Sequence, residues 1–292
     1  MEEEATITQI IIDSINAIFN TIFSSIDSNI YSVIDHITFL DTDLLKSSYF
    51  ESIFGTSVTQ GILLIANSFV LGFLLYYALK LLLSNLLITQ TERPTSFIFK
   101  MIFFGICMNS SFFLCERILF FNHAFSSLIQ DLGNSLFDCD ISFCGLLDKI
   151  QSIIHIEETN FNLFSIDGLL KSILSISFIN LAFSYSIRYI MIQVFILISP
   201  FAFLCLCSSS TSFVFKSWLK CFISLLLVQV LVSLILLLIF SIDFSPQNLF
   251  SKFLICGALF ALIKANSFVR EFLGGIGTDL SNTTANLISP GK

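Results

Sequence analysis

The sequence predicts an all-α protein: a polytopic transmembrane helix bundle of five or six spans, with an amphipathic N-terminal helix and a helical extracytoplasmic loop. Hydrophobic residues make up 55% of the chain and charged residues only 12%, whereas a soluble domain carries about 25% charged residues. The mean hydropathy is +0.89. The apolar runs are continuous and contain few prolines, which favours helices over the short alternating segments of a membrane β-barrel.

Residues 1–55 predict extracytoplasmic amphipathic helices, because isoleucines recur there at spacings of four and three residues. Such spacing places one apolar stripe on a helix. The stripe consists of Ile11, Ile15, Ile18, Ile22 and Ile26. The opposite face carries acidic and amide side chains rather than the Lys and Arg of surface-seeking helices. We therefore expect the stripe to pack against protein, with a plain surface helix as the alternative.

Residues 56–121 predict the first transmembrane hairpin. Two apolar runs, Gly61–Leu82 and Ser96–Phe121, are each long enough to cross a bilayer, which takes about 20 residues. Arg93 and Pro94 lie between them and indicate a turn.

Residues 122–167 form the longest polar stretch and predict an extracytoplasmic loop of two short amphipathic helices. Apolar residues recur every four positions on both sides of a central turn, at Leu128, Leu132 and Leu136 and at Leu146, Ile150 and Ile154. The turn contains Cys139 and Cys144. These two could form a disulfide if the loop faces an oxidising space, or remain thiols.

Residues 168–277 predict a C-terminal transmembrane bundle, followed by a polar tail at 278–292. The runs Leu169–Ile187 and Ile190–Cys207 are separated only by Arg188 and Tyr189. One helix through both would measure about 58 Å, against a hydrocarbon core of about 30 Å. We therefore expect a hairpin or sharp bend near Arg188.

The rest of this bundle contains one clear span and one uncertain segment. Leu219–Phe240 is long enough to cross, but Phe253–Val269 has only a short uncharged stretch. That segment leaves the count between five and six spans.

Polar residues within the apolar runs indicate specific contacts. Pro200 lacks an N–H and frees a carbonyl one turn earlier, which the neighbouring Ser199 could satisfy. Four amides, Asn67, Asn109, Asn180 and Gln229, also lie in apolar runs. Hydrogen bonds between helices are the expected role of these amides, and a pore lining is the alternative.

The distribution of charge predicts a multi-pass protein of the cytoplasmic membrane with its N-terminus outside. With five spans, the second ending near Phe121 and a hairpin at Arg188, eight basic residues fall inside and six outside. This bias agrees with the tendency of basic residues to stay in the cytoplasm.

No catalytic, cofactor or metal motif is visible. The chain has no P-loop, HExxH, GxSxG or CxxC pattern. Its three histidines, His36, His123 and His155, are scattered through polar segments and are expected to be surface residues. We therefore expect a protein that is not an enzyme and needs no cofactor.

The order of polar landmarks in the second half resembles a known family. The pattern is R-Y-I-M-I-Q-V-F-I-L-I-S-P-F-A-F, a short loop, K-S-W-L-K-C-F-I-S-L-L-L-V-Q, and then A-L-I-K-A-N-S-F-V-R-E-F-L-G-G. It is similar to TrbL-like membrane proteins of type IV secretion systems, in the form found in Gram-positive conjugative elements. The landmarks are Arg188, Ser199, Pro200, Trp218, Gln229, Arg270 and Glu271.

This resemblance implies a channel or scaffold subunit that helps a DNA–protein substrate across the cytoplasmic membrane. The family implies several copies in the lipid bilayer, acting with secretion ATPases and other machine components. A small-molecule transporter or permease subunit is the alternative. A holin-like lysis protein is disfavoured by the chain length and the long polar loop.

Overall fold

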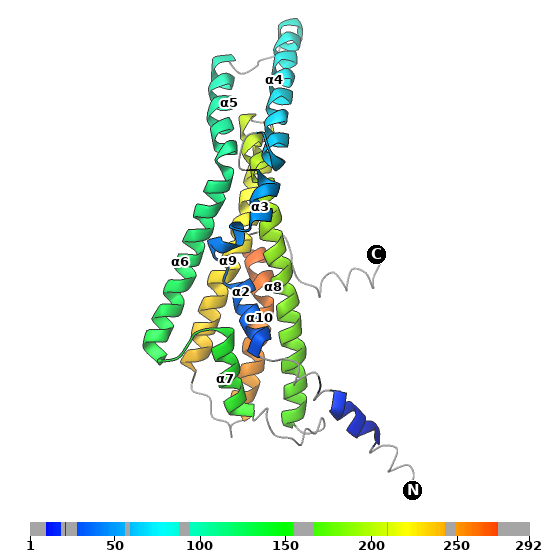
Figure 1. The fold of residues 1–292 in the computed structure, drawn as a ribbon, viewed down its shortest axis with the longest axis vertical. Coiled ribbons are helices and arrows are strands. Elements are labelled where there is room, and N and C mark those ends of the chain that lie inside the picture. The colour runs from blue at the N-terminus through cyan, green and yellow to red at the C-terminus, as the bar shows by residue number, and fades with distance from the viewer. Residues whose placement is uncertain are drawn as a thin grey trace.

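The computed structural model describes residues 10–18, 21, 28–55, 59–87, 94–154, 166–208, 210–242 and 249–273. Every regular element within these ranges is a helix (Figure 1), which confirms the all-α prediction. Five of the helices are long and apolar enough to cross a membrane. The chain is therefore a multi-pass membrane protein.

The helices run in the following order. Residues 10–18 form a first helix, which precedes α2 (Ser28–Thr38), η1 (Thr42–Leu45), α3 (Ser48–Phe54), α4 (Gly61–Leu87), α5 (Pro94–Asn109), α6 (Ser111–Phe137), α7 (Phe143–Ile154), α8 (Ile166–Leu204), η2 (Cys205–Cys207), α9 (Ser212–Ser241) and α10 (Leu249–Leu273). The candidate spans lie in α4, α6, α8, α9 and α10.

The prediction of a hairpin at Arg188 is wrong. Helix α8 is continuous over 39 residues, with Arg188 near its middle. The residues around Arg188 include no Gly or Pro that would end a helix. The side chain is fully buried, so it makes an interior contact and does not mark a membrane boundary. Because α8 passes once, α7 and the α8–α9 turn lie toward opposite ends of the bundle (Figure 1).

The expected second span is also placed differently. The helix is interrupted at Ser110 and resumes as α6, which continues to Phe137. The first part of the expected polar loop is therefore membrane-type helix. Its polar residues Asn122 and Ser126 are buried against α9. These polar residues led the sequence analysis to predict a solvated loop. In the structure they bind side chains inside the protein instead of water.

The remaining predictions for this half are partly confirmed. A turn does separate α6 from α7, and it contains the exposed Cys139. Cys144 is half-buried at the start of α7, and neither cysteine forms a disulfide. The uncertain segment Phe253–Val269 lies within α10, which is long enough to span. The described residues therefore contain five candidate spans. The charge count on the sequence also used five, but it divided α8 into two spans and left α10 out.

The N-terminal segment α2–η1–α3 packs into the bundle. Ile34 is buried with α7, α8, α9 and α10, whereas Leu40 and Leu45 are buried with α5, α6, α8 and α9. Figure 1 shows this segment running along the bundle between α6 and α8. Residues 28–54 therefore contribute side chains to the bundle core, so this part of the N-terminal region packs against other helices of the same chain.

The predicted amphipathic helix is present over residues 10–18. Ile11 and Ile18 are exposed there, at 53% and 59%. Ile15, between them, is half-buried, and Ile22 and Ile26 lie outside the described residues.

Candidate functional site

The helical N-terminal segment is interrupted between Thr38 and Thr42, and side chains from two other helices bind its backbone there. Arg188 of α8 donates from Nη2 to the Thr38 carbonyl at 2.6 Å. Gln229 of α9 donates from Nε2 to the Leu40 carbonyl at 3.4 Å. Carbonyls at a helix end lack partners within the helix. In a membrane bundle the protein itself must supply them.

A second layer of polar side chains fixes Gln229. Asn122 of α6 donates from Nδ2 to Gln229 Oε1 at 3.1 Å. One turn further along both helices, the hydroxyls of Ser126 and Ser233 lie 2.6 Å apart. All four side chains are buried. We call Thr38, Leu40, Asn122, Ser126, Arg188, Gln229 and Ser233 the central polar cluster.

Arg188 is the charged member of this cluster. Its guanidinium is fully buried and lies 5.7 Å from the ring centroid of Tyr185, one turn earlier. The Tyr185 hydroxyl donates to the Leu262 carbonyl of α10 at 3.0 Å. Arg188 also lies at the C-terminal end of α2, where the helix dipole carries about half a negative charge. The dipole therefore compensates part of the buried charge.

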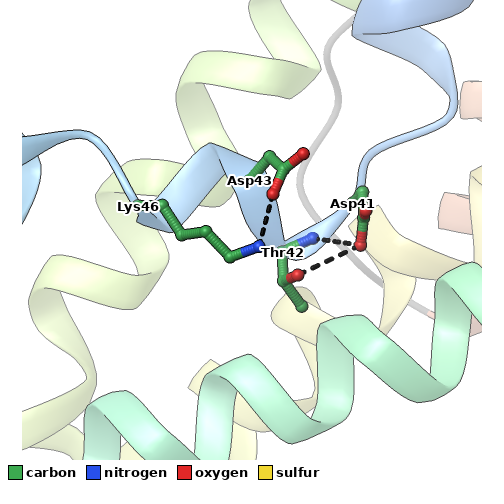
Figure 2. Close-up of polar contacts among 4 residues, drawn as sticks. All are labelled: Asp41, Thr42, Asp43 and Lys46. Atoms are coloured by element: carbon green, nitrogen blue, oxygen red, sulfur yellow. Dashed lines mark hydrogen bonds and ion pairs between the residues drawn. The ribbon is translucent and has the colours of Figure 1, made fainter.

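Charged residues lie within the interruption and directly after it. Asp41 accepts hydrogen bonds from the Thr42 backbone N–H and hydroxyl, and Lys46 pairs with Asp43 (Figure 2). The Asp43 and Lys46 side chains are 66% and 64% exposed. An exposed ion pair of this kind contributes little stability. Its position shows that this side of η1 suits water or another protein better than lipid tails.

The proline of α8 has the local contact predicted for it. Ser199 Oγ donates to the Ile196 carbonyl at 2.7 Å, the group that would otherwise accept from the N–H missing at Pro200. The indole of Trp218 on α9 donates to the preceding carbonyl, that of Phe195, at 2.9 Å. We call these five residues the proline cluster. It ties α8 to α9.

An expected result tests this arrangement. We predict that Ser199→Ala destabilises the protein by about 1 kcal/mol, the usual net value of one hydrogen bond. In a Pro200→Ala background the backbone N–H returns and binds Ile196, so Ser199→Ala should then cost much less. Thermal unfolding of the four proteins in detergent measures the coupling. Equal losses in both backgrounds would show that Ser199 does not serve the proline.

The last two landmarks join neither cluster. Arg270 is half-buried and Glu271 is exposed, both near the C-terminal end of α10. Elsewhere, Asn67 and Asn109 bind each other between α4 and α5 at 3.1 Å. The expected hydrogen bonding between helices is therefore confirmed for these two amides and for Gln229.

Two further polar contacts attach α7 to the bundle. The Asp35 carboxylate accepts from the backbone N–H groups of Phe143 and Cys144 at 2.8 and 3.2 Å. Burial raises the pKa of Asp35 above its ordinary value, although these two hydrogen bonds act in the opposite direction. Lys149 donates to the carbonyls of Phe240 and Ile242 at the end of α9. The Asp35 carboxylate contacts the N-terminal end of α7, and the Lys149 ammonium contacts the C-terminal end of α9. The helix dipole favours a negative charge at the first and a positive charge at the second.

The sequence interpretation missed Thr38, Asn122, Ser126 and Ser233. A usable signal was present for three of them. Asn122 and Ser126 are four residues apart, as are Gln229 and Ser233, so each helix carries a short polar stripe on one face. The role of Thr38 is carried by its backbone carbonyl, which residue type does not reveal.

Within the described ranges, no group of three or more His, Cys, Asp or Glu side chains could hold a metal ion. Comparisons with family models, curated proteins and solved structures found no match.

Proposed function

We propose that this chain is a membrane subunit of a type IV secretion machine of the conjugative, TrbL-like kind. It helps a DNA–protein substrate across the cytoplasmic membrane, and partner ATPases supply the energy. One observation carries the proposal. Five of the seven landmarks behind the resemblance, Arg188, Ser199, Pro200, Trp218 and Gln229, belong to the two polar clusters that join α8, α9 and the N-terminal segment. The shared pattern thus coincides with the contacts that hold this bundle together.

A single chain exposes a large apolar surface, and this supports assembly with other chains in the membrane. In α4 only 17% of the most apolar 18-residue window is buried. Large aliphatic side chains such as Leu71 and Leu75 are exposed along it. Lipid covers such a surface in a monomer, and neighbouring subunits cover part of it in an oligomer.

The functional test uses the stripe of the first helix. Replacing Ile15, Ile18 and Ile22 with Ser is expected to leave the bundle inserted but to give smaller detergent-extracted assemblies and loss of conjugative transfer. Each buried Ile contributes about 1.5–3 kcal/mol, so the triple change removes most of the contact. Native gel size and transfer frequency measure the two effects, with the wild-type chain as the complementing control. Unchanged size and transfer would show that the helix is not an assembly element.

A charge asymmetry supports an orientation with the N-terminus outside. The α6–α7 turn and α7 carry Asp138, Asp140 and Asp148 with one basic residue, Lys149, whereas the start of α9 carries Lys216 and Lys220 and no acid. These elements lie toward opposite ends of the bundle (Figure 1). Basic residues favour the cytoplasmic side, so the α8–α9 turn is assigned there. α2 contacts α7, and the start of the N-terminal segment is therefore assigned to the outer end.

Thiol labelling tests both this orientation and the single passage of α8. The native Cys139 is exposed and should react with an impermeant reagent on intact cells. In a Cys139→Ser background, a cysteine at the exposed Ser210 should react only after the cells are permeabilised. A hairpin within α8 would place both positions on the same side. Labelling of Ser210→Cys in intact cells would therefore contradict the assignment.

A specific observation favours the transporter alternative. Secondary transporters place interrupted helices and buried charges deep in the bundle, and the α2–η1 interruption beside Arg188 has this character. Uptake assays separate the two proposals. A secretion subunit should leave small-molecule uptake unchanged when it is deleted, whereas loss of uptake with normal transfer would favour a transporter.

A further inference from the structure

A half-open cavity of about 320 Å³ lies where α3, the start of α4 and the α5–α6 junction meet. Its size is at the lower end of the range for small-molecule sites, roughly 300–1,000 Å³. Most of the wall is apolar and is formed by Phe54, Leu63, Phe112 and Phe113. The rings of Phe54 and Phe112 contact each other, with centroids 5.0 Å apart. The cavity therefore offers room for a ligand and an aromatic wall against which it can pack.

Glu51 gives this wall its charge. Of the described residues that line the cavity it alone is charged, and it is exposed. Its carboxylate has neither an ion pair nor a hydrogen bond within the part of the chain that the structure describes. α3 and α5 end at the cavity, whereas α4 and α6 begin there, so the dipoles of the four helices largely offset one another. The carboxylate thus decides the sign, and it favours a positively charged ligand.

Contacts within the chain hold the walls of the cavity in place. Gly55 has a φ of +99°, and a Cβ at this position would collide with the Gln60 carbonyl oxygen. Glycine therefore lets α3 lie closer to the start of α4 than another residue would allow. Across the cavity, Asn67 of α4 donates to the Asn109 side chain of α5 at 3.1 Å. These contacts fix the cavity before binding, which lowers the entropic cost of ordering it around a ligand.

The surroundings of the cavity suit a lipid headgroup. The exposed ion pair of Asp43 and Lys46 precedes α3, whereas Leu64, which follows on α4, is apolar and exposed. Charged surface thus meets lipid-type surface beside the cavity, as it does at a membrane–water boundary. The Arg117 guanidinium lies 4.7 Å from the ring centroid of Phe113, one of the lining residues. A positive charge is therefore present next to the cavity, in addition to the negative charge on its wall.

We propose that this cavity binds an alkylammonium group, carried either by an aminophospholipid headgroup or by a free amine. The ammonium donates to the Glu51 carboxylate. The carbon atoms next to it pack on the rings of Phe112 and Phe113, whose faces also attract the positive charge. In the lipid, the phosphate adjacent to the ammonium pairs with Arg117. This inference is independent of the secretion function.

The experiment measures ligand binding by the purified full chain. Native mass spectrometry counts the lipids retained from nanodiscs that contain equal amounts of dioleoyl phosphatidylethanolamine and dioleoyl phosphatidylglycerol, which have the same acyl chains. Equilibrium dialysis in detergent measures binding of radioactive hexylammonium, with hexanol as the uncharged competitor. Wild type should retain phosphatidylethanolamine preferentially and bind hexylammonium. Glu51→Gln should weaken both about tenfold, because a charge-assisted hydrogen bond is lost.

A second variant separates the two sources of the amine. Arg117→Gln should reduce retention of phosphatidylethanolamine more than binding of hexylammonium, because hexylammonium has no phosphate. Preferential retention of the lipid would assign the site to an aminophospholipid. Hexylammonium binding that depends on Glu51, without preferential retention of the lipid, would assign it to a free amine. A wild-type chain that shows neither would overturn the proposal.

Matched variants show whether the effect belongs to this cavity. Glu51 is exposed, so its change to Gln should leave the fold intact. Glu271→Gln makes the same chemical change at an exposed glutamate of α10, and its binding should equal that of wild type. Phe113→Leu removes one aromatic face and should weaken binding by about two- to fivefold. Equal binding by wild type and Glu51→Gln would show that amines bind elsewhere and would overturn the proposal.

Discussion

Replacing Gln229 with Leu is expected to lower the free energy of unfolding by about 2–5 kcal/mol. The change leaves two buried groups without their partner: the Leu40 carbonyl and the side-chain amide of Asn122. Each unpaired buried group costs about 1–3 kcal/mol. Thermal or denaturant unfolding in detergent, with amide exchange of α2 as a local measurement, gives the size of the loss.

A double-mutant cycle shows whether the cost arises from the pair. In Asn122→Leu/Gln229→Leu both partners are apolar, and replacing both is much less costly than orphaning one. The double variant should therefore recover about 1–3 kcal/mol relative to the sum of the single changes. Full recovery is not expected, because the Leu40 carbonyl stays unpaired. Strictly additive losses would contradict the assignment of Asn122 and Gln229 as partners.

Trp218→Ala is expected to cost about 3–5 kcal/mol, the range for truncating a large buried aromatic side chain. Trp218 is 6% exposed, stacks on Phe222 with ring centroids 5.3 Å apart, and donates to the Phe195 carbonyl beside the proline. Its removal opens a cavity and also removes that hydrogen bond between α9 and α8. Trp218→Phe keeps most of the packing and should lose only about 1–3 kcal/mol, from the missing indole N–H.

The matched control lies on the same helix. Phe213 is 65% exposed, so Phe213→Ala removes an aromatic side chain without opening an interior cavity. Its expected effect on unfolding is within about 0.5 kcal/mol. Circular dichroism is the suitable readout, since Trp218 is the only tryptophan in the chain and its removal eliminates the intrinsic tryptophan fluorescence. Equal losses for the two alanine variants would show that Trp218 is not a packing centre.

Local chemistry was predictable where the partner is near in the sequence. Ser199 and the carbonyl released by Pro200 lie on the same turn of helix, so the contact follows from the geometry of one helix. The turn containing Cys139 was predicted for a similar reason, because apolar residues recur every four positions on both sides of it. Helix class and membrane character depend on composition and run length, which are properties of the sequence alone.

The predictions from the sequence were wrong where a polar residue binds a partner far away along the chain. Arg188 was interpreted as a boundary because a charge between two apolar runs normally prefers water, yet it lies at the end of α2, 150 residues away in the chain. Asn122 was assigned to a solvated loop because it begins the longest polar stretch, yet its partner is Gln229, 107 residues away. In both cases buried hydrogen bonds replace solvation, and the sequence does not show which partner is available.

The sequence by itself determined that this protein is a bundle of apolar helices in a membrane, because hydropathy and run length decide which segments can leave water. Only the tertiary structure decided that α8 is a single helix and that the N-terminal segment lies inside the bundle. The physical reason is that a buried charge or amide is acceptable only where another element supplies its partner. Here α2 supplies a helix end to Arg188, and α6 supplies an amide to Gln229.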